Sequence, residues 1–215
     1  MPLSFAQQRL WLIDQIDQGS THYLLSGALK LTGVLDRVAL QKSLMTIVDR
    51  HESLRTVFIA NIEGEPEQQV RGLQDFDVPQ HDLRQLDPVE KDLKLKDIFA
   101  TDASKDFDLS HDLLLRSKVM QVEDNVHILL VTMHHIASDG WSMSLLINEL
   151  GTLYNAYSKG LDNPLEPLAI QYADYALWQH RELQGKFLAE KLDYWKEKLA
   201  GLAPLNLPLF LFTFK

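Results

Sequence analysis

The sequence contains no cysteine. Disulfide bonds, thiolate metal sites and cysteine nucleophiles are therefore excluded. No apolar run approaches about 20 residues, so no segment is expected to span a membrane. The N-terminus also lacks a basic region followed by an apolar core, which argues against a signal peptide. These absences are typical of a cytoplasmic protein.

Positive charge is scarce as well. The chain of 215 residues has 21 Lys and Arg against 30 Asp and Glu, and its formal net charge is −9. No Lys/Arg run stands out, so nucleic acid is not an expected partner. Hydrophobic residues make up 46% of the chain and charged residues 24%, which indicates a globular protein with a substantial core.

The expected secondary structure is mixed. Residues with apolar spacing of about 3.6 predict helices, and alternating or continuous β-branched runs predict strands. Expected helices cover 4–16, 36–50, 87–105, 143–157, 170–183 and 186–199, and expected strands cover 23–31, 55–62, 68–71, 113–122 and 126–133. Ser4, Asp36, Asp87 and Ser142 are the expected N-caps. Hairpins and irregular alternation predict an α/β (α+β) fold, with helices packed on a mixed sheet.

Two adjacent histidines stand where a strand ends and a loop leads into a helix. Catalytic and binding groups of α/β folds often gather at the carboxyl ends of strands. Neighbouring side chains of a strand point to opposite faces, so His134 and His135 are not expected to share one cavity. One histidine should therefore belong to a site and the other to the structure. The same divergence argues against a metal site formed with Asp139.

Four ordered segments carry a resemblance to a known family. They are Ser4–Trp11 (SFAQQRLW), Arg50–Phe58 (RHESLRTVF), His134–Gly140 (HHIASDG) and Tyr172–Gln179 (YADYALWQ). On these segments the chain resembles the N-terminal half of a condensation domain from a non-ribosomal peptide synthetase. The resemblance implies one lobe of a fold similar to chloramphenicol acetyltransferase. Residues 1–203 would form the lobe, and 204–215 would begin an interlobe linker or be a truncated tail.

The resemblance also implies roles for individual residues. His135 would hold the attacking amine or take its proton, as a neutral imidazole with an ordinary pKa of ~6.5 can do. Gly140 would let backbone or substrate approach closely. His134 and Asp139 would be structural, with Arg55 as the candidate partner of Asp139. Breaking such a buried pair from one side would cost ~3–5 kcal/mol.

The implied activity is amide formation between a donor acyl thioester and an acceptor amine. Both would be carried on the phosphopantetheine of peptidyl carrier proteins, with no cofactor bound directly. The C-terminal lobe would be a further partner, since half a domain is expected to be inactive alone, and an exposed lobe face favours self-association. Two alternatives remain open: a non-catalytic module that binds carrier proteins or serves assembly, and an acyltransferase that uses coenzyme A thioesters.

Overall fold

The computed structural model describes residues 1–17, 21–73 and 76–203. The chain separates into two compact units, Met1–Leu177 and Trp178–Lys215. The expected linker or tail at 204–215 lies outside the described residues. Within the described residues no helix is long and apolar enough to cross a membrane.

A four-stranded sheet lies at the centre of the first unit. Its strand order is β1–β6–β5–β4. The strands are β1 (Leu24–Thr32), β4 (Gln80–Asp82), β5 (Leu115–Glu123) and β6 (Val126–His134). β6 pairs antiparallel with β1 and β5, whereas β4 and β5 are parallel, so the sheet is mixed as predicted. β4 was not predicted, because three residues are too few for a periodic pattern.

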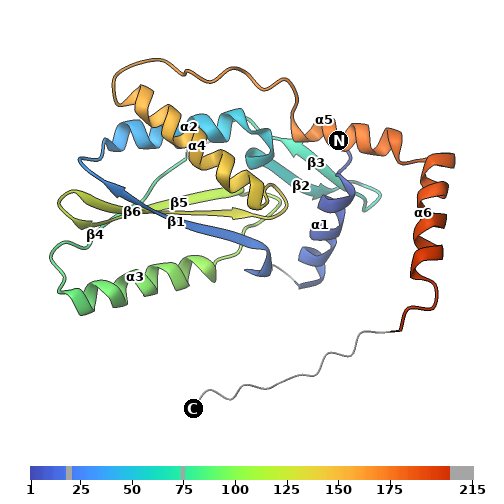
Figure 1. Cartoon of the computed structure of the whole chain (residues 1–215), viewed down its shortest axis with the longest axis horizontal. Helices are drawn as coiled ribbons and strands as arrows, with labels where there is room; N and C mark the ends of the chain where they lie inside the picture. The colour runs from blue at the N-terminus through green and yellow to red at the C-terminus, as the bar shows by residue number, and fades with distance from the viewer. Residues whose placement is uncertain (18–20, 74–75, 204–215) are drawn as a thin grey trace, which may run out of the picture. The chain divides into compact units, whose positions relative to one another are not determined.

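Helices cover both faces of this sheet (Figure 1). α2 (Arg37–Arg50) and α4 (Gly140–Tyr157) pack on one face, and α3 (Pro88–Ala103) lies on the other. The larger core cluster includes Leu44 and Ile47 of α2, Leu129 of β6 and Leu153 of α4. A smaller cluster joins Ile98 of α3 to Met120 and Leu130 of the sheet. Burying each of these side chains contributes about 1.5–3 kcal/mol.

α1 (Phe5–Asp17) and the hairpin of β2 (Thr56–Ala60) and β3 (Pro66–Val70) lie beyond one end of the sheet. The predicted capping box begins α1, because Ser4 N–H donates to Gln7 Oε1 (2.9 Å) and Gln7 N–H donates to Ser4 Oγ (3.2 Å). Short 3-10 turns occur at Thr21–Tyr23, before β1, and at Glu52–Arg55, between α2 and β2. The predicted caps Asp36 and Asp87 are also confirmed.

One predicted cap is wrong. Asp139, not Ser142, is the N-cap of α4, and the helix begins at Gly140, three residues earlier than predicted. Ser142 occupies the third helical position of a capping box, where its Oγ accepts a hydrogen bond from Asp139 N–H (3.1 Å). Serine and aspartate are both good caps, so the choice between them depends on where the preceding strand stops.

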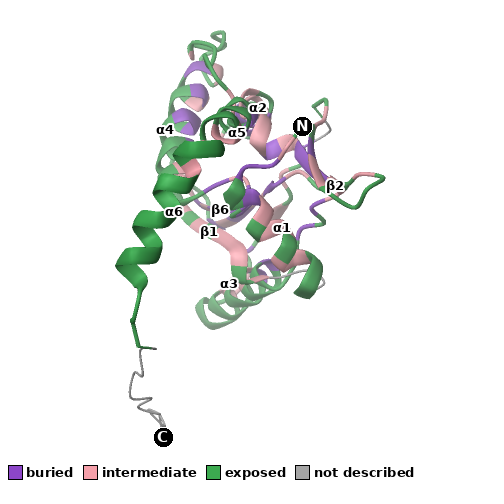
Figure 2. Cartoon of the chain, turned by 90° about the vertical axis from the view of Figure 1, so that its right-hand side faces the viewer, coloured by how far each residue is buried: buried purple, intermediate pink, exposed green. Residues whose placement is uncertain are grey.

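The second unit begins within α5 (Tyr172–Glu182) and includes α6 (Gly185–Leu199). Every residue of α6 is exposed or half-buried, as Figure 2 shows along its length. Phe187, Leu192 and Trp195 of this helix are each about half exposed. The predicted helices are therefore present, but α6 buries no apolar face within the described chain.

A buried carboxylate joins α2 to α4. Glu149 of α4 is 6% exposed. Its two carboxylate oxygens meet Arg50 Nε (3.0 Å) and His51 Nε2 (2.6 Å) at the end of α2. Because both partners belong to the RHESLRTVF segment, this contact fixes that segment against the helix that follows the histidine pair.

Replacing Glu149 by alanine should destabilise the chain strongly. The change leaves the half-buried Arg50 and His51 without their shared carboxylate, and the loss should approach the ~3–5 kcal/mol of a broken buried pair. Glu190→Ala is the matched control, since Glu190 forms an exposed pair with Lys186 that contributes at most about 1 kcal/mol. Urea denaturation measures both. Equal losses in the two variants would contradict the role given to Glu149.

Candidate active site

The histidine pair ends β6, and the two rings have opposite environments. His134 is 2% exposed, whereas His135 is exposed. His134 pairs with Leu24 across β1, and His135 N–H donates to Tyr23 O (2.8 Å) just beyond that strand. His135 lies just past the end of β6, where its side chain is exposed, whereas His134 still lies within the strand and is buried.

His134 is held as a neutral ring. Burial lowers the pKa of His134 to about 4, and the neighbouring His135 contributes in the same direction. Its Nδ1 accepts a hydrogen bond from Ile136 N–H (3.1 Å), which places the proton of the neutral ring on Nε2. The ring also meets Phe107 edge-on, with centroids 6.2 Å apart.

The turn after the pair is bonded back to His134. The carbonyl oxygen of His134 accepts from Ala137 N–H (3.0 Å) and from Ser138 Oγ (2.9 Å). Together with the Ile136 bond, these contacts give the 134–138 turn a fixed backbone. The side chain of His135 takes no part in these bonds and is exposed.

A cavity of about 540 Å³ opens beside His135. α1, the turn and the start of both α4 and α5 line it. Its lining residues are Ala6, Arg9, Leu10, Ile13, Tyr23, His135, Ile136, Ala137, Ser138, Asp139, Ser142 and Tyr172. The SFAQQRLW, HHIASDG and YADYALWQ segments all reach this cavity. Tyr172 Oη lies 3.0 Å from Ser4 Oγ and so fixes the start of α5 to the start of α1.

Two tyrosines of this cavity were not predicted as site residues. Helical spacing predicts a packing role for Tyr172, but a tyrosine has the same signature whether its ring faces a core or a cavity. Tyr23 contributes to the site through its backbone carbonyl, which accepts a hydrogen bond from His135 N–H. Every residue has such a carbonyl, so the sequence cannot predict this contact.

The predicted pair between Arg55 and Asp139 does not form. Arg55 turns back toward α2, where its guanidinium donates to Asp49 O (3.1 Å) and Arg71 O (2.5 Å). The 3-10 turn at Glu52–Arg55 directs the side chain this way, and Glu52 (3.7 Å) is its nearest carboxylate. Arg55 therefore organises the start of the β2–β3 hairpin rather than the histidine turn.

Asp139 instead begins α4. Its Oδ1 accepts from Ser142 N–H (2.9 Å) and Ser142 Oγ (2.7 Å). The Ser142 hydroxyl, the Ser142 and Trp141 backbone and the charge of His135 lower the pKa of Asp139. Both hydrogen bonds engage the carboxylate at the start of the helix, which favours the structural role predicted for Asp139.

Gly140 is the first residue of α4. A Cβ placed there would meet no described atom within 4 Å, and its φ is not positive. Neither packing nor backbone conformation within the described chain requires glycine at this position. The open space in front of it leaves room for a substrate or another part of a larger protein.

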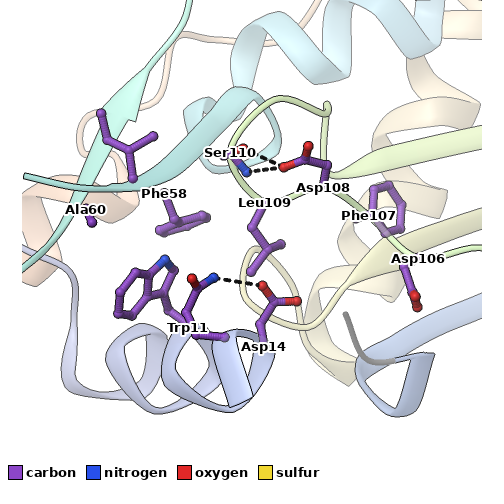
Figure 3. Close-up of a pocket in the computed structure, with 11 residues that line it drawn as sticks. Trp11, Asp14, Phe58, Ala60, Asp106, Phe107, Asp108, Leu109 and Ser110 are labelled. Carbon is purple, nitrogen blue, oxygen red and sulfur yellow. Dashed lines mark hydrogen bonds between the residues drawn. The ribbon is translucent and has the colours of Figure 1, made fainter. Parts of the chain in front are cut away.

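A second cavity, of about 630 Å³, lies between α1, β2 and the 106–110 loop (Figure 3). Trp11, Phe58 and Leu109 point into it. Burial, followed by the nearby carboxylates of Asp106 and Asp108, raises the pKa of Asp14 at its edge. This cavity is larger than the one beside His135, but no imidazole lines it, and we place the candidate chemistry at His135.

In the described ranges no three histidine or acidic side chains gather into a possible metal site. His134 and His135 point apart, and the Asp139 carboxylate is bonded to Ser142.

The family of this chain follows from its similarity to known proteins. The family model of the Condensation domain matches residues 1–210. The chain belongs to the condensation domain family. It is 44% identical over 205 residues to a linear gramicidin synthase of Brevibacillus parabrevis, covering 95% of this chain and 3% of that protein. It is also 44% identical over 211 residues to malpibaldin synthetase of Mortierella alpina, covering 97% of this chain and 4% of that protein. The chain thus spans a small fraction of these synthetases.

Solved structures similar in fold to this chain include a condensation domain. The X-domain in its complex with OxyB from teicoplanin biosynthesis superposes with a TM-score of 0.83 at 30% identity, over 94% of this chain and 44% of that one. The first condensation domain of the calcium-dependent antibiotic synthetase, in complex with a substrate analogue, shares the fold with a TM-score of 0.80 at 22% identity, over 92% and 46% of the two chains. This condensation domain chain spans less than half of either structure.

Asp139→Ala should cost about 1 kcal/mol of unfolding free energy, the usual loss for a helix N-cap, and not the larger cost of a broken buried ion pair. Asp139→Asn should remain close to the parent, because asparagine caps helices equally well. Chemical denaturation measures both variants. A loss in Asp139→Ala as large as the ~3–5 kcal/mol of a broken buried pair would restore the ion-pair interpretation.

His134 should make stability depend on pH. The unfolded chain protonates this ring below ~6.5. The folded chain protonates it below about 4. Between these values the unfolded state binds more protons, so stability is full above ~6.5 and falls as the pH drops toward 4, by roughly 3 kcal/mol in total.

Denaturation curves between about pH 7 and pH 4 measure this loss. His134→Asn is the matched variant, because its amide oxygen can accept from Ile136 N–H but does not titrate. Its stability should fall by about 3 kcal/mol less than that of the parent over this range. Identical pH profiles for the two proteins would exclude His134 as the cause.

Proposed function

We propose that this chain is the N-terminal half of a condensation domain that joins a donor acyl thioester to an acceptor amine. Both substrates are carried on phosphopantetheine arms of peptidyl carrier proteins. The arrangement at the end of β6 carries the proposal: a buried, neutral His134 fixes a turn that presents the exposed His135 to a cavity reached by three of the four family segments.

The reaction needs few groups from the protein. The amine nitrogen attacks the thioester carbonyl carbon, the carbonyl oxygen gains negative charge, and the C–S bond then breaks to release a thiol. A neutral imidazole can hold the amine by a hydrogen bond and accept its proton, which is later passed to the departing sulfur. His135 is suited to this role because its ring is not engaged by the hydrogen bonds that fix the turn.

The cavity has room for a partly polar arm. Its volume of about 540 Å³ lies within the usual range for ligand sites. Leu10 and Ile13 supply apolar wall, while Arg9 and Tyr23 supply polar groups. Gly140, in front of open space, leaves room for the approach of the second substrate. Asp139 contributes by starting α4 rather than by touching the reacting atoms.

The chain matches a little under half of each solved relative. We propose that the other half is the C-terminal lobe, that it closes the cavity beside His135, and that turnover requires it. Closure matters because a catalytic site open to water cannot hold preorganised dipoles around a developing charge. Until this surface is covered, self-association through it is also expected.

His135→Ala should abolish product without unfolding the chain. The parent and the variant are each expressed with the C-terminal lobe of a relative and supplied with loaded donor and acceptor carriers, and peptide product is measured by mass spectrometry. Because the ring is exposed, its loss should leave thermal unfolding unchanged. His111→Ala is the control and should leave product formation intact, because the His111 side chain is 70% exposed and does not line the cavity.

The outcomes separate the alternatives. Unchanged product in His135→Ala would reject the assigned role. Carrier binding that survives in every variant, with no turnover in any, would favour the non-catalytic module. Turnover of free coenzyme A thioesters without carriers would favour an acyltransferase that uses coenzyme A thioesters.

A further inference from the structure

A buried acidic residue, away from the cavity, holds two cations of the sheet. Asp102, in the last turn of α3, is 2% exposed. Arg116 Nε lies 3.3 Å from both of its carboxylate oxygens, Lys118 Nζ lies 2.7 Å from Oδ1, and Thr132 Oγ1 donates to Oδ2 (2.6 Å). Burial alone would raise the pKa of Asp102, but these partners hold it below its ordinary value.

The two cations differ in what else they contact. The guanidinium of Arg116 donates to the carbonyl oxygens of Asp102 (2.6 Å), Lys105 (2.7 Å) and Asp106 (3.4 Å), and so spans the turn that follows α3. It also lies over the ring of Phe107, 4.3 Å from the centroid. For Lys118, no bond to this turn is found among the described residues.

Phe107 connects this turn to the histidine pair. The residue is buried and lies at the border of the cavity that Trp11 and Phe58 also line (Figure 3). Its other neighbour is the ring of His134, which it meets at an interplanar angle of 80°. Phe107 thus contacts both Arg116 and His134.

We propose that Arg116 is a positioning residue for the His135 site and acts through Phe107 and His134. By holding the 104–107 turn, Arg116 keeps the Phe107 ring against His134 and excludes water from it. A dry, neutral His134 accepts the Ile136 N–H bond, whereas a protonated ring has two donors and no acceptor. Loss of that bond would release the turn that presents His135. The catalytic part of this inference rests on the proposed function.

Other charged groups also face this region. The elements packed around His134 carry Asp102 on α3, Arg116 and Lys118 on β5, Asp106 and Asp108 beside Phe107, and the adjacent His135. Of the two β5 cations, Arg116 is the one that lies over the Phe107 ring, so a comparison of the two tests the proposal.

The test is an NMR pH titration of the His134 ring in the folded chain. Arg116→Met and Phe107→Leu should each raise the pKa of His134 by about one unit or more, because both admit water to the ring. Lys118→Met also removes a cation from Asp102 but leaves Phe107 covered, and it should leave the titration unchanged. Arg116→Lys keeps the charge but loses the planar fork, and it should raise the pKa as Arg116→Met does.

Equal shifts of the His134 pKa in Arg116→Met and Lys118→Met would overturn the proposal, since the loss of a positive charge near Asp102 would then be the cause. A His134 pKa equal to that of the parent in both Arg116→Lys and Phe107→Leu would also overturn the proposal. Phe107→Leu removes none of the hydrogen bonds of Arg116, so the test stands even where Arg116→Met does not fold.

A second readout uses the chain joined to a C-terminal lobe. Arg116→Lys should lower the rate of product formation more at about pH 5 than at about pH 8, because a His134 pKa raised by about one unit leaves a large share of the ring protonated only in the lower range. A pH-independent loss would indicate a merely structural role and would overturn the proposal. If even the parent forms no product, the proposed function fails, while the His134 titration still decides whether Arg116 acts on that ring.

Discussion

The candidate site depends on a ring nitrogen that accepts rather than donates. His134 Nδ1 takes the Ile136 N–H, and it can do so because the ring is buried and uncharged. The bond closes a turn whose other contacts also end on His134. An exposed side chain one residue away, at His135, is thereby held by a backbone that has little freedom. Burial of one histidine is what gives the other a defined place.

β6 is buried on both faces along most of its length, and only the residue after its end is exposed. That residue, His135, borders a cavity lined by segments distant in sequence. The large core formed with α2 and α4 supports the strand up to its end, and Asp139 then starts α4 after a short turn. The loop between strand and helix therefore has few residues that could adopt another path.

Much of the fold could be predicted from local pattern. The caps at Ser4, Asp36 and Asp87, the strands on either side of 123–125 and the different environments of His134 and His135 follow from spacing and side-chain chemistry. The residues that a side chain contacts across the folded chain could not be predicted in this way. Arg55 bonds to carbonyl oxygens, which every residue offers, so nothing in the sequence separates Asp139 from the backbone as its partner. The contacts of Arg116 and Phe107 join three elements and leave no periodic signal.

The hydrogen bond between Tyr172 and Ser4 joins residues separated by 168 positions. It connects the first helix to the last helix that borders the cavity, so the wall beside His135 is built from the earliest and latest parts of the first unit. On a ribosome, that wall stays unfinished until the start of α5 has left the exit tunnel, although β6 and the histidine turn have already emerged. Assembly of the binding surface is thus tied to the completion of the unit, and a nascent chain that stops short of Tyr172 would display His135 without a complete pocket around it.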